Sequence, residues 1–310
     1  MRYDVIVIGG GAAGLAGALA LARARRSVLV VDGGQPRNAA AGHVHNFLTR
    51  DGTPPADLLA LGRDEVRGYG AEIITGTVTA AKPGFTVSLA DGTTHEARRL
   101  LVTTGLVDVL PDIPGLGALG GDVLHCPYCH GWEVRDQAIG VIATSPMAVH
   151  QALLWRQWSA DVTLFLNGGP EPAADESAQL SARGIRVVAE TIVDTHAGVR
   201  LADGTVVARD ALVVATHLVA RDEVLAGLGL AAEPVEMAGH VIGTAVPADP
   251  TGATSVPGVW VAGNVADPRA QVITSAAAGL TAGAAINADL VADDTRAAMA
   301  GSGSPMRQPG

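Results

Sequence analysis

The first 32 residues hold the pattern that most restricts how this chain can fold. A β-branched run at residues 3–8 is typical of a buried parallel strand, and residues 9–14, Gly-Gly-Gly-Ala-Ala-Gly, fit Gly-x-Gly-x-x-Gly. An Ala- and Leu-rich segment then predicts a helix to Arg26, and residues 27–31 predict a second strand that ends in Asp32. The glycines alone are a weak signal, but this order within about 30 residues predicts a βαβ nucleotide-binding unit.

Each part of this unit has a physical role in binding a nucleotide. Glycines let a pyrophosphate approach the backbone at the helix N-terminus, and Asp32 can accept hydrogen bonds from a ribose. A tight strand-to-helix turn without a ligand is the alternative. The uncharged run at residues 5–22 could also suggest a membrane span or a signal peptide, but three glycines interrupt it and arginines follow it. A buried strand and a packed helix explain that run better.

The only two cysteines of the chain lie two residues apart, in His125-Cys126-Pro127-Tyr128-Cys129-His130. Zinc would need two more ligands, and the flanking histidines reach a tetrahedral position poorly. Cys-x-x-Cys-His is also the attachment pattern of c-type haem, a chemistry that follows export, and the chain shows no export signal. A reversible dithiol/disulfide pair is the third possibility, and it requires a redox partner.

Length and composition indicate a globular protein of two domains. The chain has 310 residues, of which 48% are hydrophobic and 17% charged. A formal net charge of −10 argues against a nucleic-acid partner, because no basic stripe could neutralise phosphates. We expect a cytoplasmic protein without a membrane segment, a setting in which a Cys pair is more often catalytic than structural.

An internal repeat predicts a second nucleotide-binding unit. Residues 87–93 are echoed by residues 199–205, each with an Asp-Gly hairpin signal, and each copy runs on into an apolar strand. The second unit would open near Ala138, with strands at 139–143 and 162–166 and a helix at 146–158.

The remaining segments carry fewer signals. The histidines of the loop before the second helix, His43 and His45, are candidate site residues or solvated loop residues. A small-residue helix is expected at residues 270–292, with its N-terminus free to face a negative group. The Gly/Ser/Pro-rich residues 301–310 are expected to be disordered.

Together, these pieces resemble the thioredoxin-reductase-like flavoproteins over residues 3–293. The motifs that carry the resemblance are Gly9-x-Gly11-x-x-Gly14, Thr103-Thr104-Gly105 leading to Pro114-Gly115, Cys126-Pro127-Tyr128-Cys129, and Val261-Ala262-Gly263-Asn264 with Gln271-Val272.

The resemblance implies an α/β chain of two Rossmann-like nucleotide-binding domains, the class II pyridine-nucleotide-disulfide oxidoreductase fold. A discontinuous FAD domain would comprise residues 1–113 and 245–300, and an inserted NAD(P)-domain-like unit, residues 114–244, would carry the Cys pair. Members of this family are homodimers. The positions that would contact FAD are Gly9, Gly11, Ala13, Gly14, Asp32, Gly33, Arg37, Asn46, Val78, Thr104, Gly105, Gly263, Asn264, Gln271 and Val272.

Departures from the reductase pattern concentrate at the second nucleotide site. Where the reductases have Gly-x-Gly-x-x-Ala, this chain has residues 143–148, Ala-Thr-Ser-Pro-Met-Ala, so Ala143 and Ser145 replace glycines and Pro146 lacks an N–H donor. Residues 167–172 contain no arginine for a 2′-phosphate. The residue after the second cysteine is His130 rather than Asp.

The run Cys-Pro-Tyr-Cys-His-Gly-Trp-Glu is more similar to the FAD-dependent dithiol oxidases of the gliotoxin and holomycin type. That resemblance implies oxidation of a small-molecule dithiol to a disulfide, with electrons passing to FAD and then to O₂, in natural-product biosynthesis. Cys129 would face the flavin, Cys126 would exchange with the substrate, and His130 would act as acid or base. A structural role for His130 is the alternative, and His125 is expected to be structural. No metal is expected.

Two other functions remain open at this point. The chain could be a thioredoxin-type disulfide reductase that uses NADPH or another donor. It could also be a flavin-bound redox sensor or partner-binding protein without useful turnover.

Overall fold

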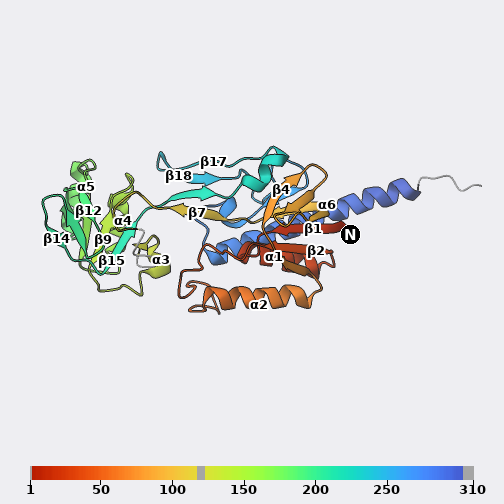
Figure 1. The fold of residues 1–310 in the computed structure, drawn as a ribbon, viewed down its shortest axis with the longest axis horizontal. Helices are drawn as coiled ribbons and strands as arrows, with labels where there is room; N and C mark the ends of the chain where they lie inside the picture. The colour runs from red at the N-terminus through yellow and green to blue at the C-terminus, as the bar shows by residue number, and fades with distance from the viewer. Residues whose placement is uncertain (1, 117–122, 303–310) are drawn as a thin grey trace, which may run out of the picture.

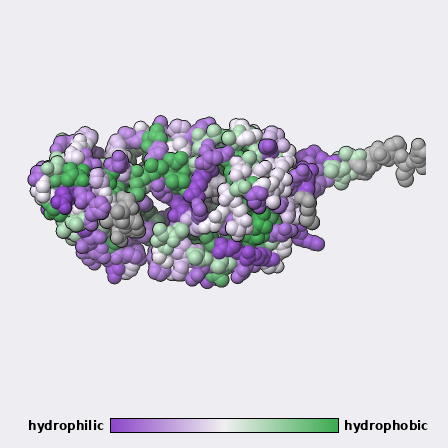
Figure 2. Space-filling view, in the orientation of Figure 1, coloured by the Kyte–Doolittle hydropathy of each residue, from purple (hydrophilic) through white to green (hydrophobic). Residues whose placement is uncertain are grey.

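The computed structural model describes residues 2–116 and 123–302 of the chain. Figure 1 shows an elongated molecule with two α/β units joined by a narrower sheet. In the space-filling view, hydrophilic and hydrophobic residues are mixed over the visible face of both units (Figure 2). The two α/β units of Figure 1 are the expected fold of two Rossmann-like domains.

The first unit is a seven-stranded sheet with the order β3-β2-β1-β6-β5-β4, in which β19 also pairs with β6. Its strands are β1 (Arg2–Ile8), β2 (Val28–Asp32), β3 (Glu72–Thr75), β4 (Val78–Lys82), β5 (Thr86–Leu89), β6 (Thr94–Val102) and β19 (Val259–Val261). The β3-β2-β1-β6-β19 part is parallel. Its helices are α1 (Ala12–Arg23), α2 (Pro55–Gly68) and α6 (Val272–Ser302). The predicted βαβ order is therefore confirmed, with α1 ending three residues before Arg26.

The second unit contains a five-stranded parallel sheet with the order β11-β10-β9-β15-β8 and a small antiparallel sheet, β12-β13-β14. The strands are β8 (Val123–Leu124), β9 (Ile139–Ile142), β10 (Val162–Phe165), β11 (Arg186–Val188), β12 (Ile192–Asp194), β13 (Val199–Leu201), β14 (Val206–Val207) and β15 (Ala211–Val214). The helices are α3 (Pro127–His130), α4 (Ala148–Trp155) and α5 (Ala174–Ala182).

Both predicted hairpins of the internal repeat form. Gly92 between β5 and β6 and Gly204 between β13 and β14 have φ of 87° and 89°, the left-handed region that glycine adopts without strain. The helix expected at residues 146–158 is shorter, because α4 begins only at Ala148 and ends at Trp155.

A four-stranded sheet, β17-β18-β16-β7, lies between the two units (Figure 1). It contains β7 (Leu106–Val109), β16 (His217–Ala220), β17 (Glu233–Met237) and β18 (His240–Ala245), and η2 (Glu223–Leu228) follows β16. Ala220, Val224 and Leu225 belong to the hydrophobic core of the first unit. These residues therefore pack on the first unit, and the bounds 114–244 of the inserted unit stay a prediction.

Helix α6 packs along α1 at backbone distance. A Cβ atom on Gly279 would overlap the Ala13 carbonyl, and one on Gly17 would overlap the Leu101 side chain and lie 3.0 Å from the Gly279 carbonyl. These glycines therefore permit the close approach of the two helices. Helix α6 continues well beyond the expected end at residue 292 and projects past the sheet (Figure 1). It includes the first two residues of the expected disordered tail, and residues 303–310 lie outside the described residues.

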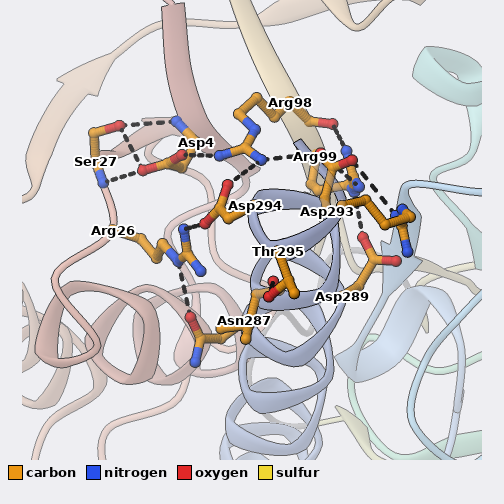
Figure 3. Close-up of polar contacts among 12 residues, drawn as sticks. Asp4, Arg26, Ser27, Arg98, Arg99, Asn287, Asp289, Asp293, Asp294 and Thr295 are labelled. Carbon is orange, nitrogen blue, oxygen red and sulfur yellow. Dashed lines mark hydrogen bonds and ion pairs between the residues drawn. The ribbon is translucent and has the colours of Figure 1, made fainter. Parts of the chain in front are cut away.

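A network of arginines and aspartates fixes the C-terminal half of α6 to the edge of the first unit (Figure 3). Arg98 on β6 contacts Asp4, Asp293 and Asp294 at 3.0, 2.9 and 2.6 Å. Arg26 contacts Asp294 at 2.7 Å. The Arg98 side chain is only 25% exposed, so its three ion pairs are less screened than most surface pairs.

Within residues 2–116 and 123–302, no helix combines the length and the apolar character that a membrane span requires.

The carboxylates of this network are held ionised. A hydrogen bond from Arg98 lowers the pKa of Asp293, and a hydrogen bond from Arg26 is the main cause of the lowered pKa of Asp294. Burial works to raise the pKa of Asp4, but hydrogen bonds from Ser27 and Arg98 outweigh it and lower that pKa too. Because all three values lie below the ordinary 3.8, the stabilisation is present above that pH and is lost as the pH falls through the lowered values.

We expect Arg98→Met to lower the free energy of unfolding at pH 7 by on the order of 1 kcal/mol, between the values for exposed and buried ion pairs. The thermal midpoint should fall by about 2–4 °C. Arg296→Met is the control, since Arg296 is 66% exposed and its ion pair with Asp293, at 3.5 Å, is longer than those of Arg98. Thermal unfolding at pH 7 and pH 3 checks this. The difference in thermal midpoint between wild type and Arg98→Met should be smaller at pH 3 than at pH 7. A gap of the same size at both values would contradict the electrostatic explanation.

Candidate active site

The Cys pair lies at the start of a one-turn helix. Cys126 is extended, with φ of −121°, and α3 (Pro127–His130) follows it directly. The backbone N–H groups of Cys129 and His130 donate to the Cys126 carbonyl, at 3.1 and 3.2 Å. This turn brings the two side chains together, and both cysteines are free and half-buried. In Figure 1, α3 lies on the side of the second unit that faces the first.

The two thiols of the pair have opposite shifts. The Cys129 thiol donates to the Cys126 sulfur, and backbone N–H groups of Cys129 and Tyr128 and the Gln271 amide add to this contact. These donors outweigh burial and lower the pKa of Cys126 from 9.0 to about 6. The contact with Cys126, followed by burial, raises the pKa of Cys129. Cys126 is therefore the thiolate of the pair at neutral pH.

The two histidines beside the pair differ in their surroundings. His125 Nδ1 lies 3.0 Å from the Val214 carbonyl, a contact that suits the structural role expected for it. His130 is half-buried, and its Nδ1 is buried without a hydrogen-bond partner among the described residues. Burial lowers the pKa of His130, so its imidazole is neutral at pH 7 and can accept a proton.

Three residues of the first unit reach the segment that carries the Cys pair. The Asn46 side-chain amide donates to the Tyr128 carbonyl at 2.5 Å, and Gln271 Nε2 lies 3.9 Å from Cys126 Sγ. His45 Nε2 lies 3.3 Å from the Glu133 carboxylate. Sequence reasoning gave Glu133 no role of its own, although it closes the run Cys-Pro-Tyr-Cys-His-Gly-Trp-Glu at residues 126–133. Within the described residues, no group of three or more His, Cys, Asp or Glu side chains is arranged to hold a metal ion.

The N-terminus of α1 fits a pyrophosphate. Gly11 is the residue before the helix, with no side-chain cap and no acidic residue in the first turn. A Cβ atom placed on Gly11 would have no atom within 4 Å, so there is open space beside this turn. The first N–H groups of an α-helix have no partner within the helix and can bind an anion. Asp32 Oδ1 accepts from Gly10 N at 3.3 Å and Gly34 N at 3.0 Å, which fixes the turn beside this space.

The other two glycines of the motif are required by packing. A Cβ atom on Gly9 would overlap the Thr103 carbonyl, and one on Gly14 would overlap the Gly9 carbonyl. Only Gly11 faces the space where a ligand would lie. The motif thus combines two packing positions with one open position.

Arg37 lies at the centre of a polar network between the two units. It donates to both oxygens of Asp108 at 2.7 Å and to Asn264 Oδ1 at 3.2 Å, and Thr216 donates to Asp108 at 2.9 Å. Burial works to raise the pKa of Asp108, but the hydrogen bonds and charge of Arg37 outweigh it and lower that pKa. Sequence reasoning missed Asp108 and Thr216. The charge of Arg37 also acts on Cys129, where it offsets a part of the rise in the pKa of that thiol.

The remaining predicted cofactor positions have contacts within the chain, and their contacts with FAD stay a prediction. Asn264 Nδ2 donates to three carbonyls, of Asp267, Pro268 and Ala270, and so shapes the loop before α6. Thr104 Oγ1 donates to the Arg221 carbonyl at 2.6 Å, and a Cβ atom on Gly263 would lie 2.9 Å from Ala13. Gly105 accepts from Arg221 N at 3.0 Å. Gly33 follows β2, Val78 opens β4 and Val272 opens α6.

Comparison with known proteins decides the family. The model of the pyridine nucleotide-disulphide oxidoreductase family matches residues 3–282. The chain belongs to this family. It is similar to thioredoxin reductase tcpT of Claviceps purpurea, at 34% identity over 94% of this chain and 95% of the relative. It is also similar to thioredoxin reductase sirT of Leptosphaeria maculans, at 31% identity over 95% and 96%.

Solved structures agree with this assignment. The crystal structure of HlmI is 47% identical, with a TM-score of 0.87, covering 97% of this chain and 96% of that one. An oxidoreductase from Agrobacterium tumefaciens is 40% identical, with a TM-score of 0.88, covering 94% and 99%. The expected resemblance to thioredoxin-reductase-like flavoproteins is confirmed. The chain is an oxidoreductase acting on sulfur, and its cofactor is FAD, which the open space at Gly11 fits.

Gly11→Leu should leave the chain folded but without FAD, because the new side chain fills the open space before α1. Gly68→Leu is the matched control, since a Cβ atom on Gly68, at the end of α2, also meets nothing within 4 Å. Flavin absorbance per chain, with circular dichroism to check folding, measures the effect. Full FAD retention in the folded Gly11→Leu protein would show that the cofactor does not use this turn.

Brief iodoacetamide treatment of the reduced protein should modify Cys126 first, with a midpoint near pH 6, because its thiolate is the stabilised one. Cys129→Ala should raise that midpoint by removing the S–H donor, whereas Cys129→Ser keeps an O–H donor and should raise it less. Peptide mass spectrometry over pH 5–9 assigns the modified residue. Earlier modification of Cys129 would reverse the roles of the two thiols.

Proposed function

We propose that this protein is an FAD-dependent dithiol oxidase, which forms a disulfide in a small-molecule dithiol through Cys126 and Cys129. The observation that carries the proposal is the strand-to-helix turn of the second unit, after β9. The Cys pair and the FAD space have the features that thiol chemistry requires, whereas this turn has lost the features that bind a dinucleotide.

The turn after β9 uses its polar groups internally. The Ser145 hydroxyl accepts from Met147 N at 3.3 Å, and Ala148 N donates to the Ser145 carbonyl at 3.1 Å. Thr144 donates to the Ala215 carbonyl at 2.9 Å. Pro146 has no N–H, so few backbone donors remain for a pyrophosphate. Asn167, at the end of the next strand, accepts from Ile192 N at 2.8 Å.

The Cys pair has the asymmetry that disulfide formation needs. In its oxidised form, one substrate thiolate attacks Cys126 Sγ; the S–S bond breaks and Cys129 leaves, taking up a proton. The second substrate thiolate then attacks the substrate sulfur of the mixed disulfide, and Cys126 leaves as a thiolate. A thiol with a pKa of about 6 leaves readily, which favours release of the product. Neutral His130 would accept a substrate thiol proton.

FAD, when bound, would supply a two-electron acceptor for the reduced Cys pair, with O₂ as the final oxidant and H₂O₂ as its product. The dithiol and O₂ are therefore the proposed partners, and a homodimer is the proposed assembly. A thioredoxin-type disulfide reductase is the second candidate, because the relatives tcpT and sirT are named thioredoxin reductases.

NADPH and NADH should reduce the bound flavin poorly. Loss of two or three charge-assisted hydrogen bonds, at about 1.5–3 kcal/mol each, would weaken dinucleotide binding by several orders of magnitude. Anaerobic mixing with excess NADPH, followed by absorbance, should show flavin that stays oxidised for seconds.

Dithiothreitol in the same apparatus should bleach the flavin, and air should restore its absorbance with uptake of one O₂ per dithiol. Cys126→Ser provides the control, since it should abolish bleaching by the dithiol but keep FAD. Rapid bleaching by NADPH would instead assign the protein to the reductases. Failure of both reductants would favour a redox sensor.

A further inference from the structure

The Cys126 sulfur is in the second unit, but one of its donors comes from the first. Gln271 Nε2 lies 3.9 Å from Cys126 Sγ, within reach of a weak hydrogen bond to sulfur. Gln271 precedes α6, and Ser275 N donates to the Gln271 carbonyl at 2.8 Å, so Gln271 belongs to the first turn of that helix. The positive end of the α6 dipole therefore lies on the side from which Gln271 approaches the sulfur.

Two other contacts hold the first unit against the same segment. The amide of Asn46 donates to the carbonyl of Tyr128, between the two cysteines, and His45 contacts Glu133. Asn46 has φ of 60° and is fixed by the Asp51 carboxylate, which accepts from its backbone N–H at 2.8 Å. The first unit thus contacts residues 126–133 from two separate parts of the chain.

We propose that Gln271 is a positioning residue that stabilises the Cys126 thiolate across the interface of the two units. The inference rests on the proposed role of Cys126 as the exchanging sulfur. Gln271 was expected to contact the cofactor, and the structure gives its amide a second task. An amide N–H stabilises the thiolate more than the thiol, so this contact favours the ionised form of Cys126.

The test is the pH profile of Cys126 alkylation in the FAD-loaded protein. Gln271→Leu removes the donor and should raise the midpoint by about 0.5–1 unit, which below pH 6 lowers the rate about three- to tenfold. Gln271→Glu keeps the shape but places a carboxylate near the sulfur, so it should raise the midpoint further. Gln179→Leu, which removes an exposed amide from α5, is the matched control and should leave the profile unchanged.

Profiles of both Gln271 variants within 0.2 units of wild type would overturn the inference. Loss of FAD from Gln271→Leu, together with an unchanged profile in Gln271→Glu, would also overturn it and leave Gln271 with cofactor binding alone. Dithiol-dependent O₂ uptake by the wild type, measured separately, tests the proposed function. A shifted alkylation profile without O₂ uptake would support the role of Gln271 and reject the oxidase. An unchanged profile with O₂ uptake would reject only the role of Gln271.

Discussion

The close packing of α6 on α1 is the contact on which the rest of the structure depends. Gly17 and Gly279 let the two helices approach at backbone distance, and the arginine–aspartate network fixes the far end of α6. This packing brings the C-terminal segment beside the N-terminal glycine turn, so that Gly263 lies against Ala13. The cofactor space is thereby built from segments about 250 residues apart. The second unit, which interrupts them, enters and leaves through the adjacent strands β7 and β16.

The chemistry depends in turn on how the first unit contacts the second. A Cys pair on a one-turn helix already favours a thiolate at its first sulfur, because backbone N–H groups and the second thiol point toward it. Gln271 adds a donor from another unit, and Arg37, held by Asp108, places a positive charge near the second thiol. The two sulfurs are therefore influenced by different parts of the first unit.

Local patterns in the sequence predicted the elements that local physics determines. The βαβ order before Asp32 and the two Asp-Gly hairpins formed as expected, because glycine conformation and apolar runs act over a few residues. Contacts between distant residues were not predictable: Asp108 and Thr216 give no signal of their own, and their network with Arg37 exists only in the folded chain. The strands after residue 216 look the same in sequence whichever unit they join, and only core packing assigns Ala220 and Leu225 to the first.

The motif at residues 9–14 shows why a sequence pattern and its function must be separated residue by residue. Gly9 and Gly14 are needed for packing in any protein that builds this turn, with or without a ligand, whereas Gly11 alone keeps space open. In the second unit, the corresponding turn also joins a strand to a helix, but the Ser145 hydroxyl accepts from Met147 N, and Pro146 has no N–H to donate. Under the proposed function, this turn would keep its place in the fold without binding a dinucleotide.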